Sequence, residues 1–154
     1  MNQNTKKIAL VADWITHWGG AERVFAKLME MYPDADIYTS VFFPTRPKVF
    51  EGRKVYTSFI QYIPFLNRRH KLCMPLRPLA FSLFRFGKYD IVISSTSAEA
   101  KGIRTKGKTK HVCYCHTPTR YLWSHPEAYR GFLEFGWLNW FAKLIIPTPF
   151  PKKN

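Results

Sequence analysis

The chain has 154 residues, of which 46% are hydrophobic and 17% aromatic. This length suits one domain with a substantial buried core, and the composition excludes an intrinsically disordered chain. Lysine and arginine number 24 against 10 aspartates and glutamates, which gives a formal charge of +14. That charge favours an anionic partner such as phosphate, nucleic acid or an acidic membrane surface, although it also fits a protein whose charge serves solubility alone.

The predicted elements alternate between strands and helices along the chain. A strand over residues 7–12 is interrupted by Asp13, and a loop containing Gly19 and Gly20 leads into an amphipathic helix over residues 21–32. Further strands are predicted over residues 36–43, 54–57, 89–94 and 110–115. The remaining predictions are a helix near Pro78, an amphipathic helix over residues 126–146 and an extended proline-rich tail over residues 147–154.

Strands separated by helical or crossover segments predict an α/β fold with a mainly parallel, Rossmann-like sheet flanked by helices. Such sheets bind ligands at the carboxyl ends of their strands. Three predicted strand ends carry small, hydroxylated or basic residues, namely the glycine loop, residues 94–97 and residues 116–120, and we expect them to share one edge. The glycine loop is either an ordinary corner or a backbone that a ligand approaches at a helix N-terminus. For residues 94–97, helix capping is the simpler interpretation.

Two motifs suggest chemistry that their context does not support. Residues 102–109 fit the phosphate-binding pattern GxxxxGK[ST], but a serine-rich stretch precedes them and a strand follows, where a strand and a helix are required. A basic hairpin is the better interpretation. Cys113 and Cys115, with His111 and His116 nearby, lack the four-ligand pattern of structural zinc sites. We therefore predict no metal and interpret the cysteines as small buried hydrophobes.

Cysteine number and apolar runs indicate the compartment. Three cysteines form an odd set without disulfide spacing, which favours the reducing cytoplasm. We expect no targeting segment, and no apolar run approaches the ~18 residues of a membrane span. The basic aromatic stretch over residues 65–86 has two interpretations. It lies on the anionic inner face of a membrane through Arg68, Arg69 and Lys71, or it packs as a core helix with extended arginines.

Four segments together resemble a known family. They are WGGAERV at residues 18–24, YDIVISS at 89–95, AKGI at 100–103 and CYCHTPTRYLW at 113–123. In this order and spacing they resemble the amino-terminal half of a family-4 glycosyltransferase. More narrowly, they are similar to bacterial mannosyltransferase-like members that build lipopolysaccharide or exopolysaccharide. The resemblance covers residues 7–146.

The resemblance implies one half of a GT-B fold, in which two Rossmann-like domains face a cleft. The amino-terminal domain, residues 1–146 here, would bind a lipid-linked or saccharide acceptor, and a carboxy-terminal domain would bind the nucleotide sugar. The implied reaction is metal-independent and retaining, with no cofactor besides the donor substrate. Gly19 and Gly20 would approach the donor diphosphate or the acceptor. His116 would be catalytic beside the transferred sugar, and Arg120 would contact a diphosphate or an anionic acceptor.

The chain ends where the donor domain of that family would begin. We therefore expect the carboxy-terminal donor domain to be absent and the chain alone to be inactive. A different class of function is a non-catalytic basic domain that binds an anionic membrane or nucleic acid. No RNA-binding or helix-turn-helix pattern is present, so nucleic acid is not an expected partner.

Overall fold

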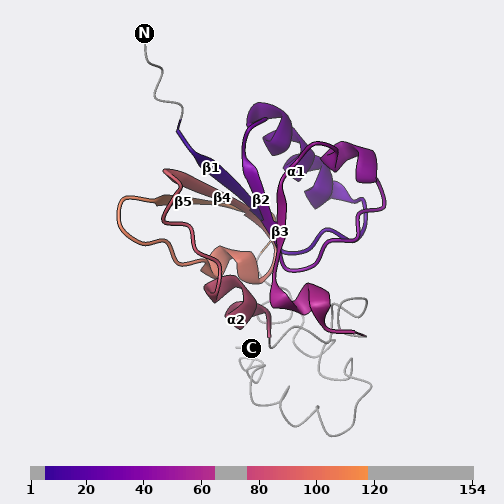
Figure 1. Ribbon diagram of the computed structural model, residues 1–154. Coiled ribbons are helices and arrows are strands. Elements are labelled where there is room, and N and C mark those ends of the chain that lie inside the picture. The colour runs from indigo at the N-terminus through magenta and orange to yellow at the C-terminus, as the bar shows by residue number, and fades with distance from the viewer. Residues whose placement is uncertain (1–5, 65–75, 118–154) are drawn as a thin grey trace, which may run out of the picture. The chain divides into compact units, whose positions relative to one another are not determined.

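Five parallel strands form one sheet within residues 6–64 and 76–117, which are the residues that the computed structural model describes (Figure 1). The strand order is β3-β2-β1-β4-β5, and every neighbouring pair is parallel. The strands are β1 (Ile8–Ala12), β2 (Asp36–Thr39), β3 (Val55–Thr57), β4 (Ile91–Thr96) and β5 (Lys110–Cys115). This order is typical of Rossmann-like sheets, and it confirms the predicted α/β class.

The central strand β1 is buried on both faces of the sheet. Ala9 and Val11 pack into one hydrophobic core, whereas Leu10 and Ala12 pack into the other. A parallel strand covered on both sides needs apolar residues at successive positions, because its side chains alternate between the faces. The uninterrupted apolar run at residues 8–12 meets this need.

One face of the sheet is covered by α1 (Gly20–Met31), whose bounds are shifted by one residue from the prediction. Phe25 and Met29 are buried in the same core as Leu10. Because residues four apart share one face of a helix, the apolar spacing turns this face toward the sheet. The helix ends two residues before Pro33, which disfavours helical backbone at the residue preceding it.

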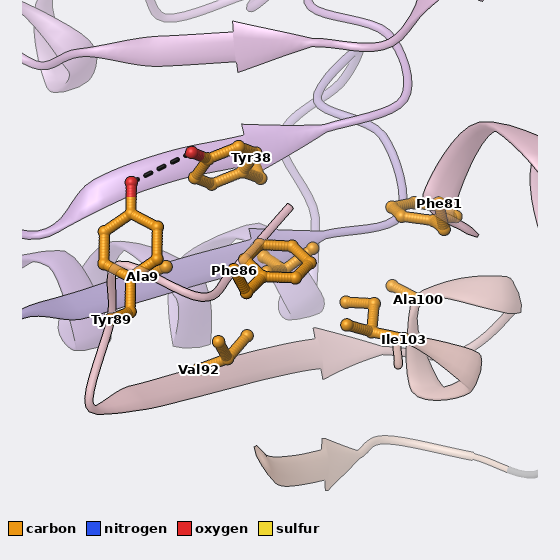
Figure 2. Close-up of a cluster of buried hydrophobic side chains, with 9 residues drawn as sticks. Ala9, Tyr38, Phe81, Phe86, Tyr89, Val92, Ala100 and Ile103 are labelled. Atoms are coloured by element: carbon orange, nitrogen blue, oxygen red, sulfur yellow. Dashed lines mark hydrogen bonds between the residues drawn. The ribbon is translucent and has the colours of Figure 1, made fainter. Parts of the chain in front are cut away.

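The opposite face is covered by α2 (Arg77–Ser82) and the short helix η3 (Glu99–Gly102). Figure 2 shows this core, in which the phenol oxygens of Tyr38 and Tyr89 lie 2.9 Å apart. Tyr89 also donates a hydrogen bond to Asp36 at the start of β2. Burial raises the pKa of both tyrosines, so both phenols are neutral at physiological pH.

Two strands, β2 and β4, differ from the prediction by more than one residue. β2 ends at Thr39 rather than at residue 43, because the residues after it bond to the loop after β1. In that contact, Ile15 N–H donates to Val41 O at 2.9 Å and Phe43 N–H donates to Ile15 O at 2.8 Å. β4 begins at Ile91 and continues to Thr96, so residues 94–96 end a strand and are not a helix cap.

Two expectations for the end of the sheet are wrong. β5 is parallel to β4, so residues 97–109 form a crossover and not a basic hairpin. Cys113 and Cys115 are exposed thiols rather than buried hydrophobes, and Val112 and Tyr114 are half exposed. The apolar composition of β5 suggested a buried strand, but within the described residues β5 has a paired neighbour on one side alone.

Some predicted segments lie outside the described residues. These are the helix over 126–146, the tail over 147–154 and residues 65–75 of the basic aromatic stretch. The described remainder of that stretch includes α2, which begins at Arg77 with Pro78 in its first turn, as predicted. Among the helices that the structure describes, none combines the length and the apolar character that crossing a membrane requires.

Candidate functional site

The carboxyl ends of β1, β4 and β5 lie next to one another at one edge of the sheet. In the strand register Ala12 pairs with Ser95, and Thr96 pairs with Cys115. A pocket of ≈ 150 Å³ opens at this edge, with Phe25 and Phe50 among its apolar lining. Its polar lining within the described residues consists of Asp13, His17, Glu22, Ser95, Ser97 and His116. Three of the predicted strand-end segments therefore contribute to one pocket.

The start of α1 is closed by a carboxylate from its own first turn. Glu22 is buried, and its Oε2 accepts a hydrogen bond from Gly19 N–H at 2.9 Å. Its Oε1 lies 3.3 Å from His17 Nε2. A negative charge is favourable at a helix N-terminus, where N–H groups lack partners within the helix. The Glu22 carboxylate therefore occupies the helix N-terminus at which the sequence suggested an anionic ligand.

The two glycines of this loop have different reasons to be glycine. A Cβ added to Gly19 would lie 3.1 Å from Glu22 Oε2, so a side chain there would disturb the cap. A Cβ added to Gly20 would meet nothing within 4 Å. Gly20 is exposed and faces open space, as the close-approach interpretation requires. Neither glycine lines the pocket itself, whereas the neighbouring His17, Ala21 and Glu22 do.

His116 is fixed at the end of β5 by three contacts. Its Nε2 lies 2.8 Å from Ser95 Oγ on β4, and its backbone N–H donates to Thr96 O at 3.0 Å. Its ring also packs edge-on against Tyr114, with centroids 5.0 Å apart. Because its ring and backbone are both held, the imidazole keeps a defined place in the pocket. His116 therefore lines the same pocket as Ala21 and Glu22 at the start of α1, and its catalytic role stays a prediction.

A second serine–histidine pair lies nearby and connects β4 to β5. His111 Nε2 is 2.8 Å from Ser94 Oγ. Because successive residues of a strand face opposite sides, Ser94 and Ser95 project to opposite faces of the sheet. Burial lowers the pKa of His111, which favours its neutral form. This pair belongs to the α2 side of the sheet and not to the pocket.

Asp13 is a residue of the site that sequence reasoning missed. It follows β1 directly, and the residue is only 7% exposed. It accepts hydrogen bonds from the Thr96 hydroxyl and from the backbone N–H groups of Ser97, Ala98 and Ala100. The available signal was an acid directly after a buried strand, combined with a serine- and threonine-rich end on a second parallel strand.

One side of the pocket is formed by an indole ring that a neighbouring cation holds in place. Trp14 lines the pocket, and the Arg77 guanidinium lies over its ring, 4.5 Å from the centroid. Arg77 also forms a buried ion pair with Glu99 at 3.0 Å. A cation over an indole face is an attractive contact. The indole is therefore held in place by the α2 and η3 side of the sheet.

Comparison with known proteins identifies the family. The sequence profile of Glycosyltransferase Family 4 matches residues 18–153, which is most of the chain. The chain belongs to glycosyltransferase family 4. Searches of curated proteins and of solved structures gave no match.

The described part of this family-4 domain does not include every residue singled out from the sequence. Arg120 and the membrane candidates Arg68, Arg69 and Lys71 lie outside it. No group of three or more histidine, cysteine, aspartate or glutamate side chains within the described ranges is placed to hold a metal ion. The phosphate-loop match is confirmed as a decoy, because η3 occupies its start and β5 follows it.

The pocket of this glycosyltransferase domain differs in charge from the chain as a whole. Its lining, as far as the structure describes it, includes the carboxylates Asp13 and Glu22 but no lysine or arginine. The formal charge of +14 is therefore carried elsewhere. Part of it lies on the crossover after η3, where Arg104, Lys106 and Lys108 are exposed. The ion pairs found among described residues include none of these three cations.

Proposed function

We propose that this domain is the acceptor side of a glycosyltransferase that moves a sugar from a nucleotide sugar to a lipid-linked or polysaccharide acceptor. The observation that supports it is the pocket at the carboxyl ends of β1, β4 and β5 in a family-4 domain. Parallel α/β sheets bind ligands at this edge. The side chains there are hydroxyl, imidazole, carboxylate and indole groups, which suit recognition of a sugar.

The charge of the pocket favours a neutral, hydroxyl-rich group over a diphosphate. A sugar hydroxyl can donate a hydrogen bond to the Glu22 carboxylate and accept one from a serine or an imidazole. A diphosphate would meet Asp13 and Glu22 without a fixed cation among the described lining residues. We therefore assign the pocket to an acceptor sugar. The donor diphosphate is proposed to approach at the open side of Gly20, with Arg120 as its cationic partner.

His116 is proposed to lie beside the transferred sugar. Its Nε2 is engaged by Ser95, so Nδ1 is the ring atom expected to meet a substrate hydroxyl. The neutral imidazole carries one donor and one acceptor, and the Ser95 hydroxyl can pair with Nε2 in either tautomer. We propose a retaining, metal-independent transfer, most similar to mannosyl transfer, with no cofactor besides the donor.

A second observation favours work at the cytoplasmic face of a membrane, where lipid-linked acceptors are held. The exposed cations Arg104, Lys106 and Lys108 lie on one short crossover, between the buried anchors Ile103 and Thr109. Basic residues near an anionic membrane each contribute about 1 kcal/mol to binding. This crossover adds to the contribution proposed for Arg68, Arg69 and Lys71. The competing class, a basic domain without catalysis, would use the crossover but not the pocket.

The experiment that tests the proposal is binding of sugars to the isotopically labelled chain by NMR. Neutral oligosaccharides related to bacterial surface polysaccharides should shift resonances of Ser95, Ser97 and His116. Inorganic diphosphate should not bind in the pocket. His116→Ala should weaken the sugar response, whereas His111→Ala, the matched change on the other face, should leave it unchanged. Shifts confined to residues 103–110, with none in the pocket, would support the non-catalytic basic domain instead.

A further inference from the structure

Asp13 accepts four hydrogen bonds from one short segment of the chain. Oδ1 accepts from Thr96 Oγ1 at 2.7 Å and from Ala100 N–H at 2.9 Å. Oδ2 accepts from Ser97 N–H at 2.8 Å and from Ala98 N–H at 3.0 Å. The carboxylate thus closes the end of β4 and the start of η3 around itself.

These contacts leave the carboxylate no capacity to act on a substrate. An ionised carboxylate offers about four acceptor sites on its two oxygens, and all four are used. Asp13 takes part in none of the ion pairs found in the described ranges. Its charge is stabilised by N–H and O–H donors alone, as in other buried anions that accept backbone hydrogen bonds. A carboxylate in this state holds its neighbours in place.

The neighbour that it holds is connected directly to His116. The Thr96 side chain donates to Asp13, and the Thr96 carbonyl accepts from His116 N–H at 3.0 Å. The preceding residue, Ser95, holds the His116 ring through its hydroxyl. One residue therefore links the carboxylate to the histidine backbone, and its neighbour orients the histidine ring.

We infer that Asp13 is a positioning residue that holds His116, through Thr96 and Ser95, in the orientation used for sugar transfer. The inference rests on the proposed function for what His116 does. The positioning itself can be measured in the free chain without any transfer. We assign Asp13 a positioning role and not a catalytic one, because protein donors occupy its acceptor positions.

The structure supplies an internal control in the second serine–histidine pair. His111 and Ser94 lie on the same two strands at the same 2.8 Å separation. Neither residue contacts Asp13 through a hydrogen bond. A general loosening of the fold would alter both histidines, whereas loss of positioning would alter His116 alone.

The experiment is NMR of the ring nitrogens of both histidines in the full chain. Asp13→Asn keeps the size of the side chain but replaces one of the two accepting oxygens with an NH2 group, which donates. We expect the His116 ring ¹⁵N resonances to shift or broaden while those of His111 keep their positions. Unchanged His116 resonances, or equal changes in both histidines, would overturn the inference.

A gentler variant covers the case in which Asp13→Asn does not fold. Thr96→Val removes only the hydroxyl that donates to Asp13 and keeps the shape of the side chain. It should move the His116 signals in the same direction by a smaller amount, and Thr96→Ser, which keeps a hydroxyl, should leave them in place. If Thr96→Val left His116 unchanged, the link would not exist. If His116→Ala left sugar binding intact, the proposed function would fail while the effect of Asp13 on the ring resonances remained.

Discussion

The pocket and the crossover after η3 are opposite in charge, although the end of β4 lines the pocket and the crossover follows β4 in the chain. Among the described residues, the pocket has two carboxylates and no lysine or arginine. The crossover has exposed Arg104, Lys106 and Lys108 and no acid between Ile103 and Thr109. Within the part of the chain that the structure describes, the lysines and arginines therefore lie outside the pocket lining. Net charge indicated an anionic partner, but the pocket favours a neutral one.

The largest effect on sugar transfer should come from substitutions at or beside the pocket. We expect His116→Ala to lower transfer by two to three orders of magnitude, roughly 2.7–4 kcal/mol, because one preorganised electrostatic contact is lost. Gly20→Val should lower it similarly by placing Cβ branches where a ligand approaches the backbone, since no protein atom lies within 4 Å to resist the side chain. The measurement is transfer of labelled sugar by a chimera that carries a donor domain.

The matched control for the glycine variant is Gly87→Val. Gly87 is also exposed, with nothing within 4 Å of an added Cβ, but it lies before β4 and away from the pocket. Gly87→Val should keep full transfer. Full activity of His116→Ala, or equal losses in both glycine variants, would show that this edge is not the transfer site.

Removing the crossover charges should affect membrane binding and spare the pocket. Replacing Arg104, Lys106 and Lys108 together with alanine should weaken binding to anionic vesicles by about 3 kcal/mol at low salt, or about 1 kcal/mol for each residue. Sedimentation with vesicles of anionic and of neutral lipid gives the measurement. Binding that is equal for both lipid types, or insensitive to salt, would contradict an electrostatic role. Sugar binding in the pocket should be unaffected.

Tyr89 contacts the end of the crossover, and its contribution to stability can be measured by unfolding the chain at alkaline pH. Thr109 Oγ1 donates to the Tyr89 carbonyl at 2.8 Å, so Tyr89 lies under the end of the crossover. The folded chain holds the pKa of Tyr89 above its ordinary value of 10.0, mainly through burial, so the unfolded chain loses the phenolic proton first. The contribution of the Tyr89 phenol to the free energy of unfolding is therefore fully present below pH 10. Above pH 10 it is lost, by up to about 1.4 kcal/mol per pH unit for one phenol.

The variant for this prediction is Tyr89→Phe. It should reduce the slope of unfolding free energy above pH 10 while lowering stability at neutral pH by about 1.5–3 kcal/mol, because the hydrogen bond to Asp36 is lost. Urea unfolding at several pH values measures both quantities. An unchanged alkaline slope would mean that Tyr89 is not the group responsible.

The smallest effect should come from changing the charge of the pocket without changing its shape. Glu22→Gln keeps an oxygen for Gly19 N–H but removes a negative charge from the start of α1. Stability should fall by about 0.3–1 kcal/mol through the helix dipole. Inorganic diphosphate should bind the pocket more tightly than in the unchanged chain. A variant with no greater affinity for diphosphate would show that Glu22 does not select against anions.

The elements with strong periodicity could be predicted from the sequence. The apolar run of β1 and the helical spacing of Val24, Phe25, Leu28 and Tyr32 predicted both elements, because burial on two faces and on one face produce different patterns. The common edge also followed from the sequence, since parallel strands place their carboxyl ends together. His116 and the start of α1 meet there as expected.

The rest depended on contacts between distant parts of the chain. Asp13 accepts hydrogen bonds from donors more than 80 positions away in the sequence. The residues around Asp13 do not predict these contacts. The exposure of Cys113 and Cys115 depends on what lies beside β5 and not on their apolar neighbours. By contrast, Glu22 accepts from Gly19 N–H only three positions away, and such a contact at a helix start can be predicted from the sequence alone.

The hydrogen bond from His116 N–H to the Thr96 carbonyl has a consequence for how this chain tolerates insertions and deletions. It ties His116 to the register of β5 against β4. Because side chains alternate along a strand, adding or removing one residue between Lys110 and His116 would turn the imidazole to the opposite face of the sheet. Residues 104–108 lie between the anchors of the crossover and are free of that constraint. The number of residues should therefore vary readily in the crossover and be fixed in the strand. The length of β5 thus determines which face of the sheet His116 occupies.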